Sequence, residues 1–407
     1  MSTKGLAFGL CLCLSLSLVA QTIQQLEYTA RERLAAKDAN AALGAYEKLA
    51  VLVPKSAAYQ DEIGFLLAAT NRSPEAISHF QHATELDPKM AQAWYHLGVA
   101  LWLTKHPDPA VAALQRAVAL APDRGDYRYR LGLAYEQSGN YREAVAELVR
   151  ATKDAEVWAP LGDAYQQLHQ YKDARNAYFQ ALRFDPKNDL ARNGYGNALV
   201  RSGDPAAGLR EFRRILAHDP GNLPAQVNVG FAYIAAGDLQ SAIEHLSALI
   251  RDHPDDAGAH YDLGIAYKQT DDLPLARTEL ERAVSLDPSL AEAHYSLGLT
   301  YLDAGIPDKA VEQLRTAVAQ RPAYNDAWYI LGTTLQQQGD ANGAIEALRR
   351  SVALDALNAA AWNNLGLLLR RNGDRAGSTE AFAKAAEIRK AEDLEKKKKL
   401  RQGTDPS

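Results

Sequence analysis

Histidine pairs are the arrangement in this sequence that comes nearest to catalytic or metal-binding chemistry. Of the ten histidines, His79 and His82 lie three residues apart, a spacing that puts two rings on one face of a helix. No HExxH motif and no supporting pair of carboxylates accompanies them, so we reject metal-dependent hydrolysis. His260 and His294 lie 34 residues apart at a position that is otherwise often aromatic, and we interpret both as rings packed in the core. We therefore predict no metal site.

The first twenty residues read as a secretory signal peptide, because Lys4 precedes an apolar run over residues 6–20. A run of this length falls short of the roughly 20 apolar residues that a membrane-spanning helix needs. We predict a signal peptide at residues 1–20, cleavage after Ala20, and a protein that is exported and therefore periplasmic or secreted. Leu18 stands where cleavage prefers a small residue, so an uncut leader that anchors the protein to the membrane is the alternative.

Other enzyme motifs are missing from the sequence. Both cysteines, Cys11 and Cys13, lie in the predicted leader, so the mature chain has no thiolate for catalysis, disulfide formation or zinc binding. There is no P-loop and no G-x-S-x-G, and Gly194 and Gly196 follow no strand pattern. We predict that the chain is not an enzyme and takes no cofactor.

The charge of the chain disfavours two classes of partner. Its formal net charge is -5, so it has no basic footprint for nucleic acid or for an anionic membrane surface. We predict protein or peptide partners, no nucleic acid, and no membrane insertion once the leader is removed.

A repeat of 34 residues organises the chain. Its clearest mark is a glycine that recurs after 34 residues in eight intervals and after 30 in one, at Gly64, Gly98, Gly132, Gly162, Gly196, Gly230, Gly264, Gly298, Gly332 and Gly366. A tyrosine often follows three residues after the glycine, and a small residue usually follows twelve residues after it. Each unit reads as two short amphipathic helices, which cannot bury their apolar faces alone and must stack on neighbours.

The pattern W-x2-L-G-x2-Y…A-x3-F…A…P at this period resembles the tetratricopeptide repeat family, in its exported bacterial form. Trp94, Trp158, Trp328 and Trp362 fill the tryptophan position, and a proline such as Pro288 ends most units. The resemblance implies an all-α fold, a right-handed superhelical solenoid of stacked helix-turn-helix repeats.

About eleven such repeats fill residues 21–392, which leaves no stretch for a separate catalytic domain. The repeat at residues 125–154 is four residues short; we interpret this as length variation, with a hinge at this point as the alternative. Residues 393–407 read as a charged C-terminal cap or tail of the kind that terminal repeats need. A polybasic contact through Lys396–Lys399 is the alternative.

The resemblance also places a binding groove on the concave side, lined by the second, fifth, ninth and twelfth residues of each repeat. The fifth residue is often tyrosine, which offers a large contact area and one hydroxyl to a peptide. The alternative is that tyrosine is simply common there in the family. We predict a partner-binding groove that contains Tyr95, Tyr129, Asn193, Asn197, Asn228, Tyr261, Asp262, Lys268, Tyr295, Tyr329, Asn363 and Arg370.

The predicted groove is mildly acidic, which favours a basic or aromatic-rich partner segment. The carboxylate clamp of chaperone-binding members is not assembled, because Gly258 and Asp262 stand where its basic residues belong. We therefore predict a protein–protein interaction scaffold or adaptor that binds a peptide segment or partner protein through the groove. The alternative is an accessory or assembly subunit of an envelope enzyme complex, such as glycosyltransferase or peptidoglycan machinery.

Overall fold

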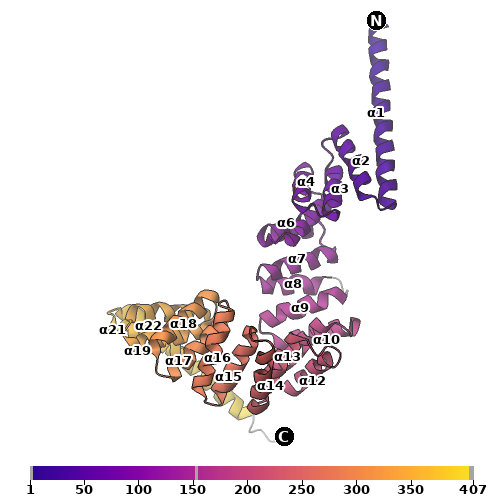
Figure 1. The fold of residues 1–407 in the computed structure, drawn as a ribbon. Helices are drawn as coiled ribbons and strands as arrows, with labels where there is room; N and C mark the ends of the chain where they lie inside the picture. The colour runs from indigo at the N-terminus through magenta and orange to yellow at the C-terminus, as the bar shows by residue number, and fades with distance from the viewer. Residues whose placement is uncertain (1–2, 152–154, 403–407) are drawn as a thin grey trace. The chain divides into compact units, whose positions relative to one another are not determined.

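The computed structural model describes residues 3–151 and 155–402, with side chains for residues 18–151 and 155–397. Within these residues the chain forms twenty-two α-helices and no strand (Figure 1). This confirms the all-α fold predicted from the repeat. The helices belong to two compact units, Met1–Ser202 and Gly203–Ser407.

The first unit contains five helix pairs followed by one further helix. The helices are α1 (Thr3–Ala35), α2 (Ala39–Leu52), α3 (Ala57–Ala69), α4 (Ser73–Leu86), α5 (Ala91–Leu103), α6 (Pro107–Leu120), α7 (Gly125–Gln137), α8 (Tyr141–Arg150), α9 (Ala155–Gln167), α10 (Tyr171–Phe184) and α11 (Asp189–Arg201). The short repeat contains α8, which is only ten residues long. The boundary between the two units lies after α11, and not at this short repeat.

The second unit begins with a single helix, which five helix pairs follow. The helices are α12 (Pro205–Leu216), α13 (Leu223–Ala235), α14 (Leu239–Asp252), α15 (Ala257–Gln269), α16 (Leu273–Leu286), α17 (Ala291–Asp303), α18 (Pro307–Gln320), α19 (Asn325–Gln338), α20 (Ala341–Leu354), α21 (Ala359–Arg371) and α22 (Arg375–Gln402).

The turn between paired helices is fixed by local chemistry, as the α19–α20 turn shows. Gly339 ends α19 with a φ of 85°, a left-handed conformation that glycine adopts without steric cost. The Asp340 side chain then accepts a hydrogen bond from the Gly343 N–H at 2.9 Å and caps the start of α20. Glycine and a capping residue in succession therefore reverse the chain within a few residues.

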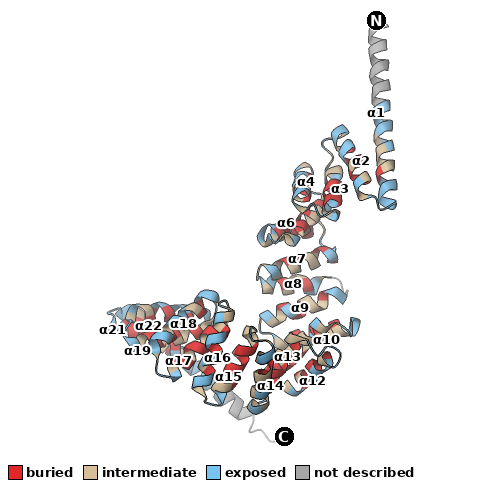
Figure 2. Ribbon diagram, viewed as in Figure 1, coloured by how far each residue is buried: buried red, intermediate tan, exposed pale blue. Residues whose placement is uncertain are grey.

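The glycine that marks the repeat lies where the paired helices meet. A Cβ built on Gly98 of α5 would lie 2.5 Å from Cγ of Leu114 in α6, and Leu114 is fully buried. The small residue thus allows a large side chain from the second helix to cover the first helix. Buried residues recur in every pair, as Figure 2 shows, so the core continues along each unit.

The α1 helix runs from Thr3 to Ala35 without interruption at Ala20. The side chains of residues 1–17, most of the predicted signal peptide, lie outside the described residues, as do those of residues 398–407 in the predicted tail. Cleavage of the leader and the role of the tail stay predictions. Among the helices of the described ranges, none is both long enough and apolar enough to span a membrane.

Candidate functional site

Most of the first helices of successive repeats pack directly on one another within each unit. In the first unit α3 contacts α5, α5 contacts α7, α7 contacts α9 and α9 contacts α11; in the second unit α13 contacts α15, α15 contacts α17 and α19 contacts α21. We call the exposed side of these odd-numbered helices the first-helix face; it carries the predicted groove residues except Asp262, which is buried.

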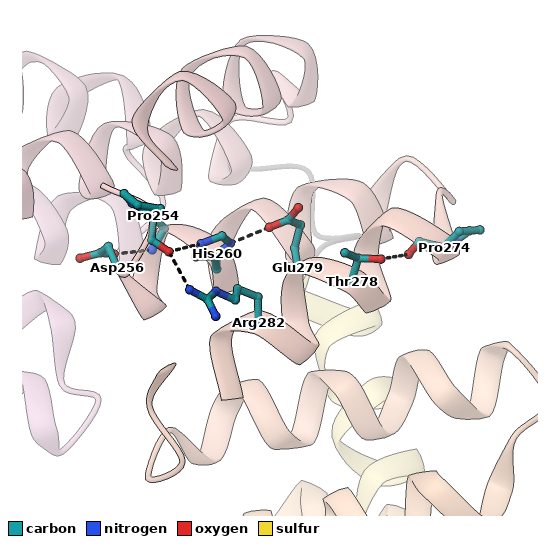
Figure 3. Close-up of polar contacts among 8 residues, drawn as sticks. Pro254, Asp256, His260, Pro274, Thr278, Glu279 and Arg282 are labelled. Carbon is teal, nitrogen blue, oxygen red and sulfur yellow. Dashed lines mark hydrogen bonds and ion pairs between the residues drawn. The ribbon is translucent and has the colours of Figure 1, made fainter. Parts of the chain in front are cut away.

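The fold holds His260 on both ring nitrogens (Figure 3). Its Nδ1 lies 2.6 Å from Glu279 Oε2, and its Nε2 lies 3.1 Å from the carbonyl oxygen of Pro254. Arg282 also donates to the Pro254 oxygen, at 3.4 Å. His260 and His294 are both buried, which confirms the interpretation of the two as core rings. In the described part of the chain, no three His, Cys, Asp or Glu side chains form a group that could hold a metal ion.

A hydrogen bond explains why different residue types share the tryptophan position of the repeat. In most of the described repeats a side-chain N–H at this position donates to the carbonyl oxygen six residues earlier, although Trp158 Nε1 has no such partner. The pairs include Trp94 with Pro88, Arg128 with Pro122, Gln226 with Pro220, His294 with Pro288, Trp328 with Pro322 and Trp362 with Ala356. Sequence reasoning missed this role. It could have been inferred, because tryptophan, histidine, arginine and glutamine all carry a side-chain N–H donor.

Tyr95, a predicted groove residue, lies on a tyrosine of the next first helix. Its ring on α5 stacks on the Tyr127 ring of α7, with centroids 4.4 Å apart and planes 16° apart. The Arg124 guanidinium lies 4.4 Å from the Tyr127 centroid and pairs with Asp126 at 2.7 Å. Sequence reasoning missed Tyr127, because it occupies the third position of its repeat rather than a groove position.

Tyr129 on α7 is half-buried, and burial raises the pKa of its hydroxyl. The guanidinium of the next residue, Arg130, lies 5.5 Å from the Tyr129 centroid and 5.6 Å from the Trp102 ring of α5. Phe65 on α3 is exposed and lies 5.5 Å from the His96 ring. The first-helix face of the first unit is therefore rich in aromatic side chains.

Two carboxylates on the first helices of this unit are in different environments. Asp61 is buried and lies 2.9 Å from Nδ1 of His96. Glu136 on α7 is half-buried, and burial, with a contribution from the charge of Asp163, raises its pKa to about 7. Sequence reasoning did not single out Glu136, although it stands at a twelfth position, which is one of the predicted groove positions.

Three of the four predicted asparagines lie on two helices, one in each unit. Asn193 and Asn197 are half-buried on α11 of the first unit, and Asn197 Oδ1 accepts a hydrogen bond from Arg201 Nε at 3.1 Å. Asn228 is half-buried on α13 of the second unit. The fold partly covers all three side chains, so they offer a partner only a limited polar surface.

Three tyrosines lie close together on the second unit. The rings of Tyr295 on α17 and Tyr324, which caps α19, are 4.9 Å apart. Burial raises the pKa of Tyr324, and Tyr261 and Tyr295 contribute to the same shift. The Arg321 guanidinium lies 5.0 Å from the Tyr324 centroid and pairs with Glu292. Tyr324 was missed because it precedes its helix and lies outside the repeat's groove positions.

The remaining groove tyrosine, Tyr329 on α19, contacts the next first helix. Its hydroxyl accepts a long hydrogen bond, 3.5 Å, from Asn364 Nδ2 of α21. The neighbouring Asn363 Oδ1 accepts one from Arg389 Nη2 of α22 at 3.4 Å. Tyr329 therefore belongs to the first-helix face, whereas Asn363 is partly engaged by the last helix.

The charged groove residues of the second unit are largely occupied within the chain. Lys268 pairs with Asp303 at 3.4 Å, and the Arg370 guanidinium lies 5.7 Å from the Phe382 ring of α22. Asp262 is buried, with 9% of its surface exposed. Asp262 is the sixth residue of its repeat, and the sixth residue of the next repeat, Ser296, is also buried, with 7% exposed. We therefore leave Asp262 out of the binding surface proposed below.

Two family models match the chain. The tetratricopeptide repeat model matches residues 62–124, 104–156, 230–291, 295–356 and 331–393, together more than half of the chain. The model described as the Cytochrome c-type biogenesis protein H TPR domain matches residues 145–251.

Several known proteins are similar to parts of the chain. Cytochrome c-type biogenesis protein CcmH of Escherichia coli (strain K12) is 46% identical over 52 residues, which cover 13% of this chain and only 15% of that relative. The crystal structure of MamA is 26% identical and covers 41% of this chain and 97% of its own, with a TM-score of 0.39. TTC0263, a thermophilic TPR protein in Thermus thermophilus, is 23% identical and covers 45% of this chain and 100% of its own, with a TM-score of 0.42. Because the repeat model matches more than half of its length, the chain belongs to the tetratricopeptide repeat family.

Proposed function

We propose that this chain is a non-catalytic scaffold that binds a segment of a partner protein along its first-helix face. The observation that carries the proposal is the row of half-buried tyrosines Tyr261, Tyr295 and Tyr329 on α15, α17 and α19. Each comes from a different repeat, so an extended segment of a partner can contact several of them at once. Tyrosine gives a large contact area for a small loss of side-chain entropy.

The tyrosines are held in place before any partner binds. Tyr295 lies against Tyr324, and Tyr329 accepts a hydrogen bond from Asn364. A side chain that is already positioned loses less conformational freedom on binding, which favours affinity. The mechanism is therefore equilibrium binding, and no reaction step is needed.

The experiment that tests this proposal replaces Tyr261, Tyr295 and Tyr329 together with alanine. Partners of the wild-type chain are first identified by crosslinking and mass spectrometry, and their affinity for each purified variant is then measured. We expect the triple variant to lose at least about tenfold in affinity, because tyrosines are frequent binding hot spots. A partner that binds the triple variant with unchanged affinity contradicts the proposal.

The control for this experiment comes from the second helices of the same unit. Leu275 of α16 and Leu354 of α20 are exposed apolar residues, at 42% and 43%. Replacing both with alanine removes apolar surface without touching the first-helix face. Affinity is expected to stay unchanged, and circular dichroism must show the same helicity in all three proteins.

A second candidate function is assembly of a complex in the cell envelope, with the chain exported. The match of residues 145–251 to the TPR domain of cytochrome c-type biogenesis protein H supports it, as does the leader predicted from the sequence. The test deletes the gene in its host and measures c-type cytochromes and the location of the chain. Normal cytochrome levels argue against this role, and a chain found only in the cytoplasm argues against any envelope role.

A further inference from the structure

The first unit carries a second surface whose chemistry differs from the tyrosine row. Tyr129 and Glu136 lie seven residues apart on α7, so two helical turns place them on one side of the helix. Asp163 lies on α9, which packs directly on α7. Its charge contributes to the raised pKa of Glu136, and the charge of Glu136 contributes to that of Tyr129. Glu136 is therefore close to both Tyr129 and Asp163, and we call these three residues the α7–α9 patch.

The carboxylates of this patch have no cation beside them. Elsewhere on the first helices of this unit, Asp61 pairs with His96 and Asp126 pairs with Arg124. Among the described residues, no lysine, arginine or histidine forms an ion pair with Glu136 or Asp163. Asp163 instead accepts a hydrogen bond of 2.5 Å from the Tyr178 hydroxyl of α10. Two neighbouring carboxylates without a counter-charge favour the binding of a cation.

Aromatic side chains continue from the patch along the same face. The guanidinium of Arg130 already lies near the Tyr129 and Trp102 rings, which shows that this surface accommodates a cation beside aromatic rings. On α3, Phe65 is 49% exposed. An exposed phenylalanine on a face that also carries Tyr95 and Trp102 gives an apolar contact area on the first helices that precede the charged patch.

We propose that the first-helix face of the first unit binds a cationic segment of a partner protein, with a lysine or arginine beside Glu136, Asp163 and the Tyr129 ring. An apolar or aromatic residue of the same segment lies over Phe65 and Trp102. A cation of the partner relieves the repulsion between the two carboxylates. It also makes charge-assisted hydrogen bonds to them and a cation–π contact with the tyrosine ring. This inference rests on the proposed scaffold function and adds the chemistry and the place of one binding site.

The test begins with a random library of twelve-residue peptides selected on the purified full chain at pH 8. Selected peptides are expected to carry lysine or arginine close to an aromatic or aliphatic residue. The strongest peptides are synthesised, and their dissociation constants are measured by fluorescence anisotropy for the wild type and for the Glu136→Gln, Asp163→Asn double variant. We expect the double variant to bind about tenfold more weakly, since it loses two partly exposed charge contacts.

The matched control changes net charge by the same amount away from the patch. Glu85 on α4 and Glu380 on α22 are exposed on second helices, and Glu85→Gln with Glu380→Gln also removes two negative charges. This control is expected to bind the peptides as the wild type does. Equal weakening in both double variants would show a general effect of net charge and would overturn the assignment to the patch.

A pH series gives a readout that mere loss of structure cannot imitate. Because the pKa of Glu136 is about 7, this residue is mostly ionised at pH 8 and mostly protonated at pH 6. The other charged or titratable groups around it are Asp163 and Tyr178 from α9 and α10, with Glu156, Arg130 and Tyr129 beyond them. Wild-type affinity is expected to fall about threefold from pH 8 to pH 6, and the fall should be absent in Glu136→Gln.

The outcomes separate this inference from the proposed function. If the library yields binders without lysine or arginine, or binders that the patch variants leave unaffected, the cationic site is wrong and the scaffold function stands. If neither the library nor crosslinking yields any ligand for either unit, both proposals fail.

Discussion

Leu280 of α16 occupies the space that a side chain on Gly264 of α15 would need, since a Cβ built there would lie 2.7 Å from Leu280 Cγ. Leu280 is fully buried, and the Ala276 carbonyl oxygen lies 3.3 Å from the same point. Gly264→Ala is therefore expected to lower the free energy of unfolding by about 1–3 kcal/mol through overpacking. Urea unfolding followed by circular dichroism measures the change.

A glycine without such a neighbour provides the control. A Cβ on Gly44 of α2 would meet no atom within 4 Å. Gly44→Ala is expected to stabilise the chain by about 0.5–1 kcal/mol, because alanine loses less backbone entropy in a helix. Similar losses of stability in both variants would contradict the packing role assigned to Gly264.

Contacts within a repeat could be predicted from the sequence, because two helices and a short turn fix their geometry. The recurrence of Gly264 and Leu280 was enough to place them in the core. Contacts between repeats could not be predicted in this way, because they depend on the offset between helices from different repeats. This is why Tyr127 was missed as the partner of Tyr95, and why Glu136 was missed beside Asp163.

The burial of Asp262 was missed for a related reason. The adjacent residues Tyr261 and Asp262 look equally able to face a partner in the sequence, but the fold leaves Tyr261 half-buried and Asp262 buried. Which of two adjacent helical residues faces solvent depends on where the next repeat packs. The site residues therefore need the structure, whereas the fold class did not.

The hydrogen bond between His260 and Glu279 predicts a second effect on stability. Glu279→Ala leaves Nδ1 of a buried ring without its 2.6 Å partner and is expected to cost about 1–3 kcal/mol. Glu279→Gln is expected to cost less, because Gln313 makes the corresponding contact with His294 at 2.7 Å. Thermal unfolding of the two variants measures both effects, and small effects of both substitutions would contradict a stabilising hydrogen bond between His260 and Glu279.

The pKa of Glu136 predicts a dependence of stability on pH. Folding raises this pKa from its ordinary value of 4.5 to about 7, so the folded state binds the proton more tightly. The contribution of Glu136 to stability is therefore present below about pH 4.5 and is lost as pH rises through 7. With solvent screening of this half-buried group taken into account, Glu136→Gln should be about 1–2 kcal/mol more stable than the wild type at pH 8, with no difference at about pH 4.5. If the difference in unfolding free energy between wild type and variant is the same at both pH values, the burial of this carboxyl is contradicted.

The predicted leader can be tested on the protein made in its host. If the signal peptide is cleaved after Ala20, mass spectrometry of the exported chain finds Gln21 or a near neighbour at the N-terminus. Recovery of the intact N-terminus, Met1 included, in the membrane fraction would instead favour the anchored alternative.

The most direct test of binding through the first-helix face places a photo-crosslinking amino acid at Tyr329 in α19 and, separately, at Leu354 in α20 of the same repeat. Both chains are expressed in the native host and irradiated, and crosslinked proteins are identified by mass spectrometry. A partner that crosslinks to position 329 and not to position 354 is the predicted result. A partner that crosslinks to position 354 alone would show that the second helices form the interface and would contradict the scaffold proposed here.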